Sequence, residues 1–361
     1  MNRGASPSRR ESAIVRSLCA WFIANRRDLP WRPAPGKPAD AHRDPYRVLV
    51  SEAMLQQTQV SRVLEKFDAF MRRFPTVRVL AEAEEADVLA AWSGLGYYRR
   101  ARNLHAAAKM VAGRFAGQLP ATVEELLELP GVGRYTAGAI ASFAFGVRAP
   151  LVDGNVRRVF MRIEGEDLGP VAKETDAWSW RVAERLIAHA ESPAIWNEAL
   201  MELGALVCTP GKPQCERCPV RTTCRAHEMG TQEKIPRAKA AAKKREVFHA
   251  CVVVRDGRGR VLVETRPGTG MWSGMTQPPT VERDDRPASA AELKAAVGLS
   301  GARLLKSFVH QTTHRTVRFA VYEGRTARGR PPLRGEFVAL GAVAGRALSN
   351  PHRRMLLGTE R

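Results

Sequence analysis

The sequence contains no apolar run that approaches the ~18 residues needed to span a membrane. Its basic start, residues 1–10, is not followed by the apolar stretch of a secretory signal, because Trp21-Phe22-Ile23 is soon followed by the polar and charged residues of 25–28. It also contains no internal repeat. From these absences we expect a cytoplasmic protein that makes no use of a membrane.

Acidic residues are scarce as well. The chain has 37 Asp and Glu against 57 Lys and Arg, which gives a formal net charge of +20. Such an excess favours a polyanionic partner. A genome rich in G and C that favours arginine gives the same excess, so the charge alone leaves RNA, ribosomes and membrane surfaces open. The choice between these partners rests on the motifs.

The length of 361 residues is too great for one ordinary core, so two domains are expected. Residues 1–224 have apolar positions at helical spacing, punctuated by Gly and Pro. The stretches expected to be helical are 46–74, 83–92, 100–115, 123–127, 135–145, 155–163 and 178–190. Asp44-Pro45 is typical of a helix start, with an Asp cap and Pro in the first turn.

Residues 225–247 are polar and basic and are expected to connect the two domains. From 248 the pattern becomes that of strands separated by turns. The expected strands are 248–254, 260–264, 304–309 and 316–322, with one helix at 291–297. The sequence therefore predicts a mainly α N-terminal domain over 1–224 and an α+β C-terminal domain over 248–361.

The segment 208–224 contains four cysteines with the spacing C-x6-C-x2-C-x5-C: Cys208, Cys215, Cys218 and Cys224. Four thiolates so close in sequence can surround a metal centre. A structural zinc ion is the alternative, although such sites usually use two tight pairs and only Cys215 and Cys218 form one. Two disulfides are not expected in the cytoplasm. Cys19 and Cys251 lie outside the pattern and are expected to be buried free thiols.

A glycine-rich turn, Leu-Pro-Gly-Val-Gly-Arg-Tyr at 129–135, lies between two predicted helices. Gly131 and Gly133 let the backbone turn sharply and approach a ligand closely. The free N–H groups at the start of the second helix favour a phosphate. The motif predicts contact with a nucleic-acid backbone without base reading, and a plain turn between two helices is the alternative.

Two carboxylates are candidates for acid and base chemistry. Glu52 shares its predicted helix face with Val48, Leu49 and Leu55. An apolar setting raises a carboxyl pKa, and a value near ~6–7 suits a general acid. Asp153 precedes a predicted helix, where an Asp is often only an N-cap. The two roles are compatible, because a capping Asp stays anionic.

These motifs together resemble the adenine DNA glycosylase (MutY) branch of the endonuclease III or helix-hairpin-helix superfamily, over residues 20–224. The strings that carry the resemblance are LPWR at 29–32, SEAMLQQTQV at 51–60, GLGYY at 94–98, the glycine-rich turn, VDGN at 152–155 and the cysteines. The resemblance implies excision of adenine mispaired with guanine or 8-oxoguanine in double-stranded DNA. It also implies a [4Fe–4S] cluster on the four cysteines, and we expect a monomer.

The resemblance also implies a role for single residues. Glu52 would protonate N7 of adenine and Asp153 would stabilise the oxocarbenium ion, with Asn155 orienting the site. Gln57 and Tyr97 would wedge into the base stack as adenine flips out. The residues implied to line the adenine pocket are Trp31, Arg32 and Glu198. For Trp31 and Tyr97, packing in the core is the alternative.

Tyr135 distinguishes the branches of the superfamily. Members that also cleave the strand carry a lysine there, which forms a Schiff base with the sugar, and a phenol cannot form that imine. We therefore expect base removal only. An endonuclease III-like pyrimidine glycosylase with lyase activity is opposed by Tyr135 and by the extra C-terminal domain. A DNA-scanning protein without catalysis is opposed by the presence of both Glu52 and Asp153.

Residues 248–360 resemble the Nudix-like domain of the same family, which recognises 8-oxoguanine. The usual Phe-Ser-His corresponds here to Thr312-Thr313-His314, so a hydroxyl and an imidazole remain at Thr313 and His314 while the aromatic ring is lost. Phe308 or His310 would supply a ring if the register of the hairpin differs. Nudix hydrolase activity is not expected, because the stretch 291–299 offers only Glu292 where a glutamate-rich metal box is required.

Overall fold

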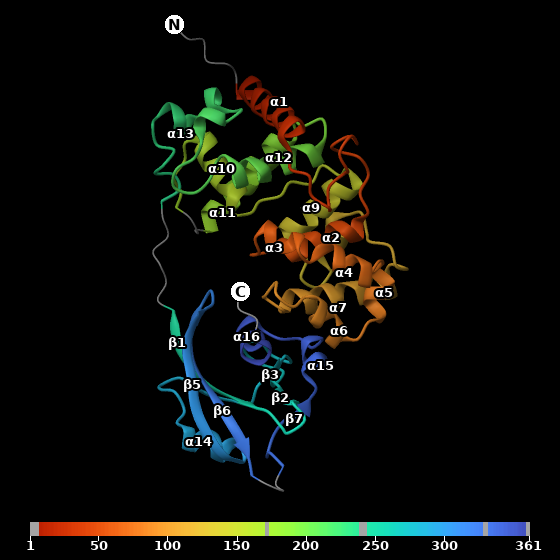
Figure 1. Ribbon diagram of the computed structural model, residues 1–361. Coiled ribbons are helices and arrows are strands. Elements are labelled where there is room, and N and C mark those ends of the chain that lie inside the picture. Colours follow the sequence, from red (N-terminus) through yellow and green to blue (C-terminus); the bar gives the residue numbers. More distant parts are fainter. Residues whose placement is uncertain (1–6, 170–172, 238–243, 328–330, 359–361) are drawn as a thin grey trace. The chain divides into compact units, whose positions relative to one another are not determined.

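The computed structural model describes residues 7–169, 173–237, 244–327 and 331–358. The chain divides into two compact units, which Figure 1 shows in rainbow colours. The first unit comprises 1–82 and 103–240, and the second comprises 83–102 and 241–361. Residues 238–243 of the predicted connector at 225–247 lie outside the described residues. The division is thus not a single cut, because residues 83–102 group with the C-terminal part.

The first unit is helical. Its helices are α1 (Pro7–Asn25), α2 (Pro45–Leu55), α3 (Val60–Leu64), α4 (Phe67–Arg73), α5 (Val77–Glu82), α8 (Val123–Leu127), α9 (Arg134–Phe145), α10 (Gly154–Glu164), α11 (Lys173–Ile187), α12 (Pro193–Leu206) and α13 (Arg225–Glu228). The helix α7 (Arg99–Arg114) crosses the boundary, and α6 (Glu85–Ala91) belongs to the second unit. No helix among the described residues has the length and apolarity that a membrane crossing requires.

Local signals explain where these helices begin. Asp44 accepts a hydrogen bond from the backbone N–H of Tyr46 at 2.9 Å, with Pro45 in the first turn of α2, as predicted. The continuous helical run expected over 46–74 is wrong, because the chain breaks after α2 at Gln57, whose φ of +53° no helix accommodates. The buried helix α12 was not predicted at all, since its apolar residues surround it and leave no periodic stripe.

The second unit contains two sheets. The larger has the order β4-β1-β6-β5, in which β1 (Arg245–Val254) pairs parallel to β6 (Arg315–Thr326) and the outer pairs are antiparallel. The smaller has the order β3-β2-β7. The remaining elements are β2 (Val261–Thr265), β3 (Thr276–Gln277), β4 (Thr280–Arg283), β5 (Leu299–Gln311), β7 (Glu336–Val338), α14 (Ala290–Val297), α15 (Leu340–Ala344) and α16 (Asn350–Leu357).

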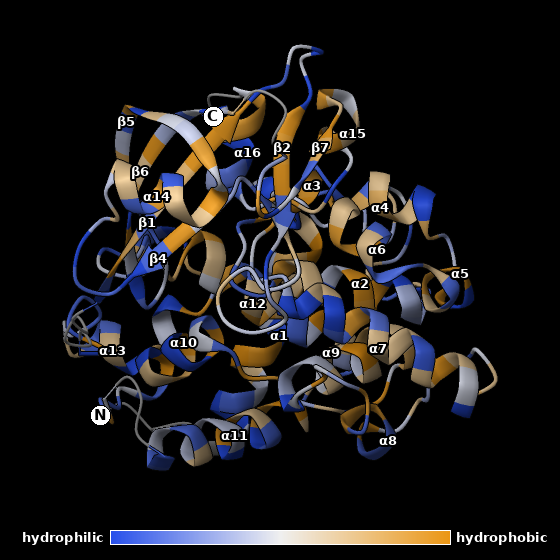
Figure 2. Ribbon diagram, turned by 90° about the horizontal axis from the view of Figure 1, so that it is seen from below, coloured by the Kyte–Doolittle hydropathy of each residue, from blue (hydrophilic) through white to orange (hydrophobic). Residues whose placement is uncertain are grey.

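Both faces of the larger sheet are covered. The alternate side chains of β1 enter two cores, with Val252 and Val254 on the face that α14 covers and Cys251 on the face that Met355 of α16 covers. Figure 2 shows these strands as largely hydrophobic ribbons. The sequence predicted most of them, with β5 longer than expected. Cys251 is buried as predicted, whereas Cys19 is only half-buried.

The helix α14 contains Glu292, the one carboxylate of the stretch 291–299. Glu292 accepts a hydrogen bond from the backbone N–H of Ser289 at 2.7 Å and closes a capping box with it. The same carboxylate pairs with Arg283 at 2.7 Å and with Arg286 at 2.9 Å. Glu292 therefore caps a helix and balances two arginines.

Candidate active site

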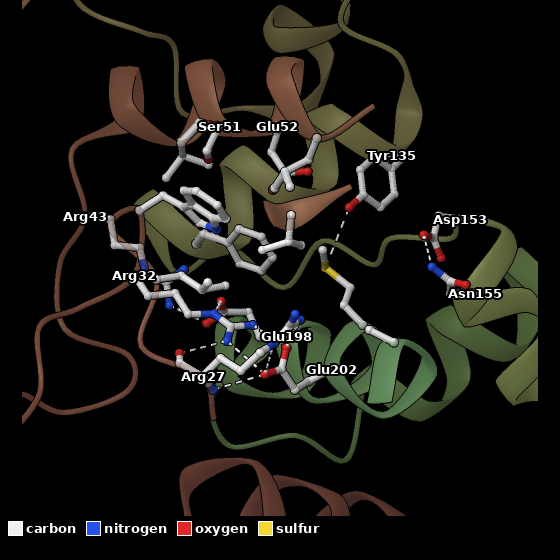
Figure 3. Close-up of a pocket in the computed structure, with 18 of the residues that line it drawn as sticks. Arg27, Arg32, Arg43, Ser51, Glu52, Tyr135, Asp153, Asn155, Glu198 and Glu202 are labelled. Carbon is white, nitrogen blue, oxygen red and sulfur yellow. Dashed lines mark hydrogen bonds and ion pairs between the residues drawn. The ribbon is translucent and has the colours of Figure 1, made fainter. Parts of the chain in front are cut away.

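A cavity of about 190 Å³ lies within the first unit. This is several times the ~30 Å³ that one water occupies in the liquid, so the cavity admits a ring-sized molecule. Figure 3 shows Glu52 of α2 on one side of it, Glu198 and Glu202 of α12 on the opposite side, and Asp153 at the start of α10. The predicted site residues that line it are Trp31, Arg32, Glu52, Tyr135, Asp153, Asn155 and Glu198.

Glu52 is a buried carboxyl, with 4% of its surface exposed. It lies on α2 between the buried residues Ser51 and Ala53. Burial raises the pKa of Glu52 to about 7, because it removes water from the charged form. A hydrogen bond with Tyr135 acts in the opposite direction, and the negative charge of Glu198 adds to the rise. At neutral pH a large fraction of this carboxyl is therefore protonated.

Asp153 caps helix α10. Its Oδ1 accepts a hydrogen bond from the backbone N–H of Val156 at 2.7 Å, and its Oδ2 faces Nδ2 of Asn155 at 3.4 Å. The N-cap alternative is thus realised, and the same carboxylate lines the cavity. A negative charge at this end of a helix is favoured by the helix dipole. The cavity holds two carboxyl groups in different surroundings, one buried on a helix and one at a helix start.

Tyr135 lies in the first turn of α9, between the two carboxyl groups. Its hydroxyl contacts Glu52 and donates to Sδ of Met201 at 3.6 Å. Burial holds the pKa of Tyr135 well above its ordinary value, and the negative charges of Glu52 and Asp153 add to the effect. The phenol is therefore neutral in the site.

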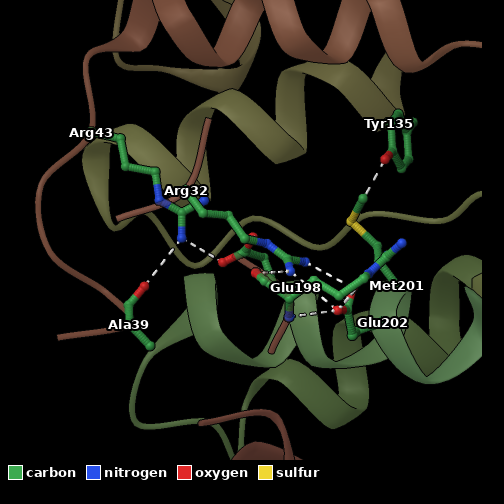
Figure 4. Close-up of polar contacts among 8 residues, drawn as sticks. Arg32, Ala39, Arg43, Tyr135, Glu198, Met201 and Glu202 are labelled. Atoms are coloured by element: carbon green, nitrogen blue, oxygen red, sulfur yellow. Dashed lines mark hydrogen bonds and ion pairs between the residues drawn. The ribbon is translucent and has the colours of Figure 1, made fainter. Parts of the chain in front are cut away.

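Opposite Glu52, two glutamates of α12 meet the arginines Arg27, Arg32 and Arg43 (Figures 3 and 4). Glu198 accepts from Nε of Arg32 at 2.8 Å and pairs through its other oxygen with Arg43. Glu202 accepts from Arg32 at 3.0 Å and from Arg27 at 2.8 Å. Glu198 and Arg32 were predicted to line a pocket, and the other three were not. The sequence could have indicated Glu202, because it follows Glu198 by four residues and so lies on the same face of one helix. No sequence pattern indicated Arg43.

These pairs set the charge of the groups they contain. Burial opposes ionisation of Glu202, yet hydrogen bonds from Arg27 and Arg32 lower its pKa to about 2. Burial likewise disfavours the guanidinium of Arg32, but Glu198 and Glu202 outweigh it and raise its pKa. The wall opposite Glu52 thus carries fixed charges of both signs. Trp31 packs edge-on against the ring of Phe67, with 5.3 Å between centroids, so it serves the core and lines the cavity.

The glycine-rich turn joins α8 to α9 as a helix-hairpin-helix. Gly131 has a φ of +79°, which side chains rarely adopt, and Gly133 is the N-cap of α9 without a side-chain cap. Both glycines are exposed. The first N–H groups of α9 are therefore available to an external acceptor such as a phosphate.

The four predicted metal ligands line one small cavity of about 20 Å³, together with Arg162. Nη1 of Arg162 donates to Sγ of Cys208 at 3.3 Å. Among the described residues no trio of His, Cys, Asp or Glu side chains is arranged to hold a single metal ion. The donor set of four thiols around one cavity, with a guanidinium beside it, suits a negatively charged iron–sulfur cluster.

Helix α10 connects the cysteine loop to the carboxylate side of the cavity. Arg158 donates through Nε to the backbone carbonyl of Cys208 at 2.9 Å and through Nη2 to Oδ1 of Asn155 at 3.0 Å. Asn155 in turn faces Asp153. The cysteine loop thus fixes the orientation of Asn155 through one arginine.

The remaining predicted residues lie elsewhere. Gln57 is exposed directly after α2, in a left-handed conformation. Tyr97, 48% exposed and with a φ of +48°, belongs to the second unit, where its hydroxyl contacts that of Thr313. Left-handed backbone at a non-glycine residue is strained, and such strain gathers at functional positions. Gln57 and Tyr97 are therefore both exposed residues with a polar end group and a left-handed backbone conformation.

Thr312, Thr313 and His314 form the turn between β5 and β6. Thr312 uses its hydroxyl within the turn, accepting from the backbone N–H of Arg315 at 3.0 Å, while Thr313 and His314 are exposed. Phe308 is partly buried and stacks on Phe319 with 4.9 Å between centroids. His310 lies beside Trp272 with 5.9 Å between centroids. Both rings therefore pack against aromatic residues of the domain.

Comparison with known proteins agrees with this arrangement. Residues 50–195 match the family described as HhH-GPD superfamily base excision DNA repair protein, and residues 250–358 match the NUDIX domain family. The chain is 35% identical to the human adenine DNA glycosylase over 375 residues, covering 89% of this chain and 68% of that protein. This chain belongs to the adenine DNA glycosylase family.

Other adenine DNA glycosylases are similar to different extents. The protein of Mycobacterium tuberculosis (strain ATCC 25618 / H37Rv) is 45% identical over 206 residues, covering 56% of this chain and 64% of that one. A protein of Buchnera aphidicola subsp. Baizongia pistaciae is 30% identical and covers 84% of both. The chain spans 60% of the length of the rat relative. The family and the two-part fold predicted from the sequence are thereby confirmed.

Solved structures match the helical part. A thermostable thymine-DNA glycosylase aligns over 62% of this chain and 100% of its own, with a TM-score of 0.55 and 28% identity. Endonuclease III in a non-covalent DNA complex aligns over 63% of this chain and 100% of its own, with a TM-score of 0.51 and 22% identity. The latter likeness shows the fold alone.

The raised pKa of Glu52 predicts a pH dependence of base excision. An acid with a pKa of about 7 is protonated below that value and ionised above it. The single-turnover rate should therefore fall about tenfold per pH unit above pH ~7. Glu52→Gln should lower the rate by ~10²-fold or more below pH ~7 and remove the pH dependence, because the amide cannot give up a proton. The difference from the wild type should therefore narrow as the pH rises above ~7.

The matched control is Glu65→Gln, which removes an exposed carboxylate paired with Arg62. It should keep the wild-type rate and profile. A Glu52→Gln variant that retains a near-normal rate, with unchanged DNA binding, contradicts the role of Glu52 as proton donor.

Proposed function

We propose that this chain removes adenine mispaired with guanine or 8-oxoguanine in double-stranded DNA, by hydrolysis of the N-glycosidic bond. The removal would begin base excision repair of that mispair. The observation that carries the proposal is the pair of carboxyl groups in one cavity, the buried Glu52 and the helix-capping Asp153. Cleavage of a glycosidic bond needs an acid at the leaving group and an anion at the sugar.

In the first step Glu52 gives its proton to N7 of the flipped adenine. The bond between C1′ and N9 breaks, and its electron pair leaves with the base. The positive charge that develops on the sugar is stabilised by the carboxylate of Asp153, which Asn155 orients. Water then adds to C1′, and the proton that it releases restores the acid form of Glu52.

The base would lie against the wall formed by Arg32, Glu198 and Trp31. The Glu198 carboxylate, held by two arginines, accepts hydrogen bonds but cannot donate them. It therefore suits the exocyclic amine of adenine and opposes the carbonyl that guanine carries at the same place. The choice of base follows from this difference.

Tyr135 limits the reaction to base removal. A strand-cleaving glycosylase attacks C1′ with an amine and passes through a Schiff base. Tyr135 instead offers a neutral phenol between Glu52 and Asp153. The product would be an intact strand with an abasic site.

DNA would be held through its backbone at the glycine-rich turn, where Gly131 and Gly133 expose the N–H groups that begin α9. Gln57 and Tyr97 would enter the stack that adenine leaves and offset part of the cost of a few kcal/mol for flipping the base. In the second unit Thr313 and His314 would contact the lesion, without the stacking that an aromatic residue at 312 provides. The preference for 8-oxoguanine would be correspondingly weaker.

The four cysteines would hold a [4Fe–4S] cluster through their thiolates. When bound, such a cluster ties the loop together by covalent bonds to iron, and we assign it no step of the reaction. The position of the cysteine loop affects the active site through hydrogen bonds of helix α10. Arg158, anchored on the carbonyl of Cys208, orients Asn155 beside Asp153.

The proposed reaction predicts a characteristic product. Duplexes with adenine opposite 8-oxoguanine or guanine should lose adenine, whereas adenine opposite cytosine should react far more slowly. The strand should remain intact until alkali is added, and borohydride should trap no covalent complex, because Tyr135 supplies no amine. Gel analysis with and without alkali measures both. Efficient trapping would overturn the restriction to base removal, and excision of pyrimidines alone would overturn the substrate.

The cysteine spacing predicts the metal content. Anaerobically purified protein should contain about four irons per chain and absorb visible light. Cys218→Ser should lose iron and melt at a lower temperature, while the matched control Cys251→Ser, at a buried cysteine outside the loop, should retain it. Metal analysis decides the matter, and stoichiometric zinc would contradict the iron–sulfur assignment.

The exposed turn between β5 and β6 predicts the source of lesion preference. Thr313→Ala and His314→Ala should each lower the ratio of excision rates opposite 8-oxoguanine and opposite guanine, by roughly two- to tenfold for one lost hydrogen bond. Thr326→Ala, at the far end of β6, serves as control and should leave the ratio unchanged. Ratios equal to the wild type in both variants would show that this turn does not read the lesion.

A further inference from the structure

The segment 26–44 forms a wall of the cavity although it contains neither helix nor strand. It runs from the end of α1 to the start of α2 and contributes Arg27, Arg32 and Arg43. A segment without a backbone ladder has no regular hydrogen bonds to fix its side chains. Its position must come from contacts with other elements.

Those contacts form an alternating chain of charges. Its order is Arg27, Glu202, Arg32, Glu198, Arg43, with the arginines from the irregular segment and the glutamates from α12. Figure 4 shows the chain along α12, with Arg43 at one end. Glu198 and Glu202 are 3% and 1% exposed, and arginines donate hydrogen bonds to both carboxylates. Each oxygen of Glu198 accepts one of these bonds and keeps a free lone pair for a further donor.

The members of this chain fall into two groups, those that would touch the base and those that hold them. Arg32 and Glu198 are the members that would touch the base under the proposed function. Glu202 lies behind Arg32 and holds both of its Nη atoms, at 3.2 Å and 3.0 Å, and also accepts the backbone N–H of Arg27 at 3.0 Å. Arg43 holds Glu198 and is itself held by the carbonyl of Ala39 at 3.1 Å.

We propose that Glu202 and Arg43 are positioning residues, which fix Arg32 and Glu198 in the orientation that recognises the exocyclic amine of adenine. This inference rests on the proposed function. A guanidinium with one carboxylate partner can rotate about its side chain, whereas Arg32, bound to Glu198 and Glu202 at once, has one orientation. The same holds for Glu198 between Arg32 and Arg43. The recognition wall is thus rigid before the base arrives.

The alternative is that the chain of charges only stabilises the fold. Removing one partner from a buried ionic cluster leaves an uncompensated charge, so a loss of stability is expected in either case. The two roles differ in what they do to the choice of base. A purely structural cluster changes the excision of every base alike, and a positioning cluster changes only the excision of a base that carries the amine.

The experiment compares adenine with purine, which has N7 and the same glycosidic bond but lacks the exocyclic amine. Single-turnover excision of each, opposite guanine, gives an adenine-to-purine rate ratio in which proton donation by Glu52 cancels. Glu202→Gln and Arg43→Gln should each lower this ratio roughly tenfold relative to wild type, because a charge-assisted contact is lost or misdirected. Rates on purine itself should change little.

The matched control is Glu164→Gln. Glu164 is also a buried carboxylate of the first unit, paired with Arg10 at 3.1 Å and Arg185 at 2.8 Å, and it does not line the cavity. It should lower the melting temperature as Glu202→Gln does, and keep the wild-type ratio. A ratio unchanged in Glu202→Gln and Arg43→Gln overturns the inference.

A milder variant keeps the test valid if Glu202→Gln or Arg43→Gln fails to fold. Arg27→Gln removes only one of the two arginines on Glu202 and changes a side chain that is 33% exposed. It should fold and lower the ratio by about two- to threefold, since Arg32 keeps its pairing with Glu202. A ratio at the wild-type value here also counts against positioning by Glu202. Failure of the wild-type chain to excise adenine would instead reject the proposed function, so the two failures are distinct.

Discussion

A buried carboxylate is stable only beside a positive charge, and in the first unit two buried carboxylates share one guanidinium. Glu198 and Glu202 both bind Arg32, and this shared arginine joins α12 to a stretch of chain that has no secondary structure of its own. Without Arg32, each buried glutamate would keep a single guanidinium partner, Arg43 for Glu198 and Arg27 for Glu202. The wall of the cavity that faces Glu52 depends on this shared arginine.

The cavity uses burial in two opposite ways. Around Glu52 the apolar helix face favours the uncharged acid, whereas around Glu202 paired guanidinium groups keep the carboxylate charged in spite of burial. The same side-chain chemistry therefore gives a proton donor on one wall and fixed charges on the other. Because the two glutamates have opposite pKa shifts, one small cavity contains both a proton donor and a charged wall that can recognise the base.

The sequence predicted what depends on local pattern and missed what depends on distant partners. The cap at Asp44, the helix-hairpin-helix turn and the carboxyl of Glu52 all follow from neighbours within a few residues. Arg43 gave no signal, because its partner Glu198 lies 155 residues away and charged loop residues are usually solvated. The length of the helical run through 46–74 was overestimated, since spacing does not reveal a left-handed turn at Gln57. Nothing in the pattern of 83–102 indicates that it groups with the C-terminal strands.

That last grouping has a consequence for how the molecule is assembled. The second unit takes residues 83–102 from early in the chain, and Tyr98 donates to the carbonyl of Leu348 across 250 residues. During synthesis, residues 83–102 therefore emerge long before their partners exist, and closing so long a loop is slow. A protease that cuts between 237 and 244 leaves the second unit in two pieces that are held by non-covalent contacts alone. Neither half of the chain, cut at that point, carries a complete second unit.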